Sequence, residues 1–182
     1  MKNVLSLSGL VLILLLANGV AHPQQTSQDI LINKASQYFK YVKNRDFYNA
    51  ATLFHFPKHY SQKERKDDVH AVSKTLELFA DKFGNILVAN LNQTPNPFYH
   101  VMTGGGDLRY WQKHPSSIKV IYEVTFEKES KGYVGLSFCN IDGNWEIRQV
   151  AYGIPAARSD ARARITIIQK EMTQLIQSLS KQ

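Results

Sequence analysis

Histidines are the first residues to examine for chemistry in this 182-residue chain. His55 and His59 are four residues apart, a spacing at which two histidines on one helix can share a metal ion. Pro57 lies between them and breaks a helix, and no third ligand is near in the sequence, so we expect no metal site. His100 stands beside aromatic residues on an expected strand. It is our first choice if a general base exists, although a half-buried, hydrogen-bonded histidine is the alternative.

Cysteine and glycine offer two further possibilities. Cys139 is the only cysteine, so no internal disulfide can form. A catalytic thiolate needs a nearby base, and none can be paired with it from the sequence, so we expect a small buried side chain. Gly104-Gly105-Gly106 suggests a phosphate cradle, but such loops open a helix and this one does not. We interpret it as a turn or a lid, and we expect no cofactor.

Four aromatic residues are the candidates for binding. Tyr122 supplies the only polar group on the apolar face of its expected strand, and Trp145 is expected to line the same space. Tyr110 and Trp111 follow the glycine turn and could form a binding surface. The alternative for Tyr122 and Trp145 is an ordinary aromatic core.

The first 21 residues have the pattern of a cleavable signal peptide. Lys2 precedes an apolar run over Val4–Ala17, and Gly19 and Ala21 place small side chains at the two positions that signal peptidase selects. A membrane span needs about 20 apolar residues, so this run is too short for a stable anchor. We expect an exported bacterial protein, periplasmic or secreted, after cleavage near Ala21.

The remainder, residues 22–182, has the length of one domain. The whole chain carries a formal net charge of +7, which favours anionic surfaces weakly. We find no nucleic-acid-binding motif, and the expected compartment also argues against nucleic acid as a partner.

Hydrophobic spacing predicts four helices. Asp46 is a suitable cap for the second, and Ser61 with Glu64 forms a capping-box pattern at the start of the third. Gly84 is suited to end that helix. The expected helices cover about residues 27–44, 46–56, 61–84 and 156–180.

Three arginines, Arg158, Arg162 and Arg164, lie near the start of the last expected helix. Positive charges at that end oppose the helix dipole. Either a solvated face or contact with an anionic partner would account for them.

Alternating patterns predict five strands, over Ile86–Gln93, Phe98–Thr103, Ile118–Glu127, Tyr133–Ile141 and Trp145–Tyr152. The last three form an antiparallel meander, with Asp142-Gly143-Asn144 as a hairpin turn. A simple hairpin register would place Tyr133, Cys139, Val150 and Tyr152 on the second face of the sheet. We expect the C-terminal helix or a partner subunit to cover that face.

Helices followed by a curved antiparallel sheet describe an α+β fold. Two segments, Asp46–Ala51 and Asp142–Ile147, resemble the second-helix start and the last-strand turn of the nuclear transport factor 2-like superfamily, and Val150–Ile154 resembles the ending of small exported members. The likeness covers about residues 28–155. It implies a pocket between the helices and the concave sheet face, with an Asp or His base in enzymatic members. No acidic residue here matches that base.

These observations favour a non-catalytic exported module that binds a small ligand or a protein partner. Two alternatives stay open: a pocket enzyme of isomerase or hydrolase type, and a homodimeric assembly module. The resemblance decides among none of them, because one fold serves many functions.

Overall fold

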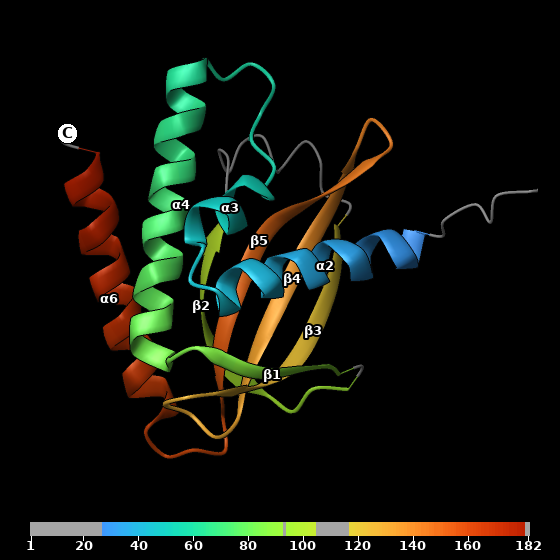
Figure 1. Ribbon diagram of the computed structural model, residues 1–182. Coiled ribbons are helices and arrows are strands. Elements are labelled where there is room, and N and C mark those ends of the chain that lie inside the picture. The colour runs from blue at the N-terminus through green and yellow to red at the C-terminus, as the bar shows by residue number, and fades with distance from the viewer. Residues whose placement is uncertain (1–26, 93, 105–116, 181–182) are drawn as a thin grey trace, which may run out of the picture.

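The computed structural model describes residues 27–92, 94–104 and 117–180. It is an α+β structure, with helices on one side of a curved antiparallel sheet (Figure 1). This confirms the predicted fold class. The expected signal peptide and the segment that contains Tyr110 and Trp111 lie outside the described residues.

The four helices are α2 (Ser27–Lys43), α3 (Phe47–Thr52), α4 (Gln62–Phe83) and α6 (Ala161–Leu179). Local capping sets their ends. The Asp46 side chain accepts a hydrogen bond from the Asn49 amide, and Ser61 and Glu64 form the predicted capping box. Gly84 ends α4 with φ of 82°, a conformation that favours glycine.

The five strands are β1 (Ile86–Leu91), β2 (Phe98–Gly104), β3 (Ser117–Phe126), β4 (Gly132–Ile141) and β5 (Asn144–Pro155). Their order across the sheet is β1-β3-β4-β5-β2, and every neighbouring pair is antiparallel. Asp142 and Gly143 both have positive φ, as a tight type I′ hairpin requires.

An irregularity in the β4–β5 pairing changes which residues face the helices. Ser137 pairs with Gln149 and Phe138 with Ile147, so Arg148 is an extra residue in β5. One inserted residue turns the following side chains to the opposite face. Val150 and Tyr152 therefore face the core, and the prediction that they lie on the outer face is wrong. Tyr133 and Cys139 have the alternation expected for the outer face and are buried.

The C-terminal helix is part of the helical layer. Figure 1 shows α6 beside α4, and α6 also contacts edge strand β2. Its buried residues Ala161, Ile165 and Ile168 belong to the same core cluster as the helix-facing side of the sheet. It therefore does not cover the outer face. In the described residues, no helix is long and apolar enough to cross a membrane.

The start of α6 also differs from expectation. The helix begins at Ala161 rather than near Ala156, because residues 156–160 form a turn. Arg158 in this turn and Arg164 in the first turns of α6 both form ion pairs with buried Glu129. Two of the three arginines thus bind an anionic group within the chain itself.

Candidate functional site

The interior of the curved sheet, where the resemblance implies a pocket, is filled with aromatic side chains. The Tyr38 and Tyr152 hydroxyls hydrogen-bond to each other at 2.9 Å, and both residues are fully buried. Phe79 and Phe83 pack on the Tyr152 ring, with centroids 4.9 and 5.7 Å away. Burial raises the pKa of both tyrosines, so neither hydroxyl serves as a base near neutral pH.

An open groove lies at the rim instead, between α2 and the edge of the sheet. Two hollows of about 270 and 460 Å³ lie along it. These volumes are close to or within the range of small-ligand sites. We call this the α2–β1 groove and define it by its lining residues: Ser27, Gln28, Leu31, Ile32, Ser36, Phe39, Lys40, Lys43, Asn44, Ala89, Leu91, Ile118, Val120 and Tyr122.

Helix geometry places the two hollows end to end. Residues four apart lie on one side of a helix, and the α2 wall includes such a row: Gln28, Ile32, Ser36, Lys40 and Asn44. The strand wall follows the same direction. Leu91 and Ala89 on β1 are the direct partners of Tyr122 and Val124 on β3. The two hollows therefore follow one another along α2, between the helix and the strand edge.

The two ends of the groove differ in chemistry. At the N-terminal end of α2 the lining is mainly aliphatic, with Leu31, Ile32, Leu91, Ile118 and Val120. Leu91 and Ile118 are 48% and 42% exposed, which is high for large apolar side chains facing a helix. Apolar surface left open in a concave site favours an apolar ligand.

At the other end, Tyr122 and Phe39 form the floor and two lysines the rim. The two rings meet edge to face with centroids 4.7 Å apart, and Tyr122 is only 8% exposed. Burial raises the pKa of the Tyr122 hydroxyl, so it stays protonated at neutral pH. Lys40 and Lys43 come from the last turn of α2.

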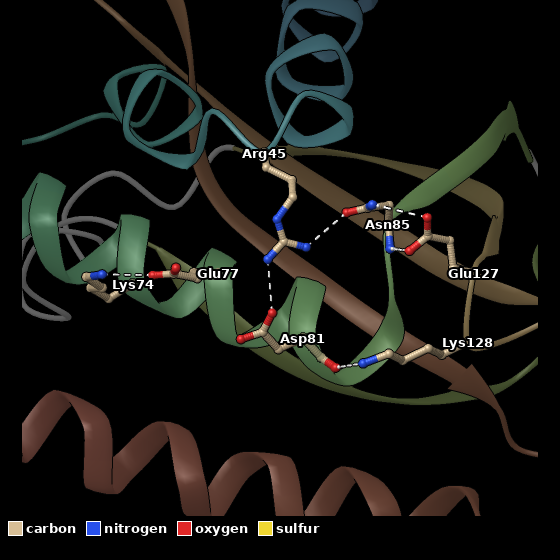
Figure 2. A network of polar contacts seen from close by, with 7 residues as sticks. All are labelled: Arg45, Lys74, Glu77, Asp81, Asn85, Glu127 and Lys128. Atoms are coloured by element: carbon tan, nitrogen blue, oxygen red, sulfur yellow. Dashed lines mark hydrogen bonds and ion pairs between the residues drawn. The ribbon is translucent and has the colours of Figure 1, made fainter.

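A polar network holds the groove walls together at this end (Figure 2). Arg45, just after α2, donates to Asp81 on α4 at 3.0 Å and to Asn85 before β1 at 3.2 Å. Glu127 in turn accepts from the Asn85 amide at 3.0 Å. Arg45 thus connects the end of α2 with both α4 and the start of β1.

The structure separates the residues predicted for binding. Tyr122 lines the groove, whereas Trp145 is partly buried near the β4–β5 hairpin. Their partners on β4 are Val134 and Asn140, which are six residues and thus roughly 20 Å apart. Tyr122 and Trp145 therefore do not line one space.

His100 lies on the outer side of edge strand β2, since the alternating residues Val101 and Thr103 are the buried ones. Partial burial lowers the pKa of His100, and the charge of Lys119 lowers it further. It is thus neutral near pH 7 but does not face the filled interior or the groove.

The remaining chemical candidates are occupied by structural contacts. His55 is buried, with its Nδ1 2.5 Å from Glu146 Oε2, while His59 packs against Tyr60. Within the described ranges, no group of three metal-binding side chains occurs. Burial, with a smaller effect of Glu146, raises the pKa of Cys139 to about 11, so its thiol is protonated at neutral pH.

Most of the groove was missed by sequence reasoning. The apolar residues that predicted α2 form a stripe along the helix, and the α2 wall of the groove lies next to this stripe. Ile32 widens the apolar stripe toward the groove. The uncharged segment Ile86–Leu91 is a second signal, because exposed edge strands usually carry charge. Together these features indicate an apolar opening between the helix and the edge strand.

No known protein family and no curated protein sequence matches this chain. Similar solved structures include a candidate NTF2-like transpeptidase from Campylobacter jejuni, which is 14% identical with a TM-score of 0.39 over 63% of this chain and 94% of that one. A variant of a protein of unknown function from Mycobacterium tuberculosis is 11% identical, with a TM-score of 0.42 over 97% of this chain and 96% of that one. At these values we draw nothing about activity. The helices packed on one face of a curved antiparallel sheet form the α+β arrangement that the resemblance implied.

Proposed function

We propose that the protein is a non-catalytic module that binds an apolar small ligand in the α2–β1 groove. The observation that carries this proposal is the contrast between the interior of the curved sheet and the α2–β1 groove. Aromatic side chains fill the interior, whereas the groove stays open and exposes Leu91 and Ile118. Among its described lining residues the groove has no paired acid and base, because the ionisable groups there are Lys40, Lys43 and Tyr122.

The energetic case rests on the aliphatic end. Each buried methylene contributes about 0.8 kcal/mol to binding. An apolar molecule that covers these side chains therefore gains affinity from burial of its own surface and of the groove's apolar surface. Backbone hydrogen bonds of α2 and of the β1–β3 pair keep both walls in place without a ligand. A site formed in advance loses less entropy when a ligand binds.

The test is titration with N-phenyl-1-naphthylamine, a neutral apolar fluorophore whose emission rises in an apolar site. Ile118→Trp would fill the groove with a larger side chain, and we expect affinity to fall by at least about tenfold, or 1.4 kcal/mol. The matched control is Ile167→Trp on α6, where the replaced side chain is 57% exposed and distant from the groove lining.

Both variants should keep the urea midpoint of the unmodified protein, since each alters an exposed position. Failure of the fluorophore to bind, or equal loss of affinity in both variants, would contradict the proposed site.

A further inference from the structure

We infer that the ligand of the α2–β1 groove is a single-chain amphiphile with an anionic head group, such as a fatty acid. Its head lies at Lys40 and Lys43 and its tail between Ile32, Ile118 and Val120. This inference rests on the proposed function and adds the class of ligand and its direction in the groove.

The first argument is charge. Lys40 and Lys43 both line the hollow beside Tyr122, and no carboxylate is among the described residues that line either hollow. Neither lysine has an ion-pair partner in the described part of the chain, whereas nearby Arg45 is paired with Asp81. Two unpaired cations at the edge of an apolar site favour an anionic group on the bound molecule.

The second argument is direction. Within the described lining, both cationic side chains, Lys40 and Lys43, belong to the end of the groove beside Tyr122. A bound anion is therefore attracted to that end. At the aliphatic end the polar residues of the described lining are Ser27 and Gln28, and the others are aliphatic, which suits a hydrocarbon tail.

The third argument is length. Ile32 and Lys40 are eight residues apart on α2, which is about 12 Å along the helix axis. A molecule that contacts both must be elongated, with its charge separated from its apolar part. This excludes an inorganic anion, which would leave the aliphatic end uncovered, and a compact neutral ring, which would leave the lysines uncovered.

Dodecanoate and dodecan-1-ol form the decisive pair of probes, because they share one chain and differ in head-group charge. Each displaces N-phenyl-1-naphthylamine from the purified protein, at monomeric concentrations in low salt. We expect dodecanoate to bind about tenfold more tightly than the alcohol. Lys40→Gln/Lys43→Gln should remove this preference and leave the affinity for the alcohol unchanged. Lys34→Gln/Lys63→Gln, which changes the net charge equally outside the groove, should leave the preference intact.

The outcomes separate this inference from the proposed function. Equal affinities for the acid and the alcohol, or a preference that survives in Lys40→Gln/Lys43→Gln, would overturn the anionic head group while leaving the groove as an apolar site. If neither probe binds, the proposed function itself fails. Lysine-dependent binding to phosphatidylglycerol vesicles without binding of monomeric dodecanoate would overturn the inference in favour of a membrane surface.

Discussion

At the scale of single residues, the Tyr38–Tyr152 pair explains why the interior is closed. Each hydroxyl is buried and satisfies the other at 2.9 Å. A buried hydroxyl without a partner is costly, so the two residues are energetically coupled although one lies on a helix and the other on the sheet. The pair therefore fastens α2 to β5 through the centre of the core.

Tyr38→Phe and Tyr152→Phe should each lower the free energy of unfolding by about 1–3 kcal/mol, since each leaves one buried hydroxyl unpaired. The double variant should recover a large part of the loss, because both polar groups are then absent. Urea unfolding followed by circular dichroism gives the three values. A double variant whose loss equals the sum of the single losses would show that the hydroxyls are not coupled.

Residues that line the groove were harder to predict than core residues. Tyr122 was singled out because it carries the only polar group on the apolar face of its strand. Lys40 and Lys43 were not, because basic residues near a helix C-terminus are common for reasons of the helix dipole alone. Lys40 and Lys43 line a groove only because β1 lies beside α2, and this placement is not visible in the sequence.

At the scale of elements, α6 is attached to the rest of the protein in two places: along its packed face and at its start. Its apolar residues Ala161, Ile165 and Ile168 enter the core, and Lys82 on α4 pairs with Glu171 at 2.5 Å. At its start, Arg158 and Arg164 bind Glu129, which is only 4% exposed. A buried carboxylate held by two arginines makes this turn a specific attachment point rather than a solvated face.

Glu129→Gln should lower the free energy of unfolding by about 1–3 kcal/mol. It removes the charge on which both arginines depend, but both arginines are partly exposed and recover some hydration. Hydrogen exchange should show the loss chiefly in the first turns of α6. Arg162→Gln, at an exposed position on the same helix turn, is the control and should change stability by less than about 0.5 kcal/mol. A uniform loss of protection over the whole sheet would contradict a local role.

Elements whose signals are local were predicted well from the sequence. Asp46, Ser61 with Glu64, and Gly84 mark helix ends through contacts within one turn, and the structure has those ends. The extra residue Arg148 in β5 has no such local signal, because a bulge depends on how β4 and β5 pair. Its effect is large, since it turns Val150 and Tyr152 inward and so supplies part of the core.

At the scale of the whole molecule, the filled interior and the open rim belong together. The α2 helix crosses the sheet (Figure 1). It contributes Tyr38 to the buried core, and another flank of the helix forms one wall of the groove. The residues that α2 places beneath it, among them Tyr38 and Phe39, belong to the buried core. Both hollows described along α2 lie toward the edge of the sheet, beside β1 and β3.

Export is the remaining prediction at this scale. We propose that the chain is cleaved after Ala21, because Gly19 and Ala21 are small and the apolar run before them is short. Since α2 begins at Ser27, this cut leaves both walls of the groove complete. Mass spectrometry of the soluble exported fraction from a bacterial host should detect a protein that begins at His22.

Ala21→Lys provides the test of that cut, because a long charged side chain does not fit the peptidase pocket. We expect this variant to retain residues 1–21 and to remain with the membrane fraction. Gln24→Lys adds the same charge beyond the cut and should be processed like the unmodified chain. Recovery of unmodified protein that is soluble in the cytoplasm and still carries residues 1–21 would contradict export, and the ligand would then have to be sought among cytoplasmic amphiphiles.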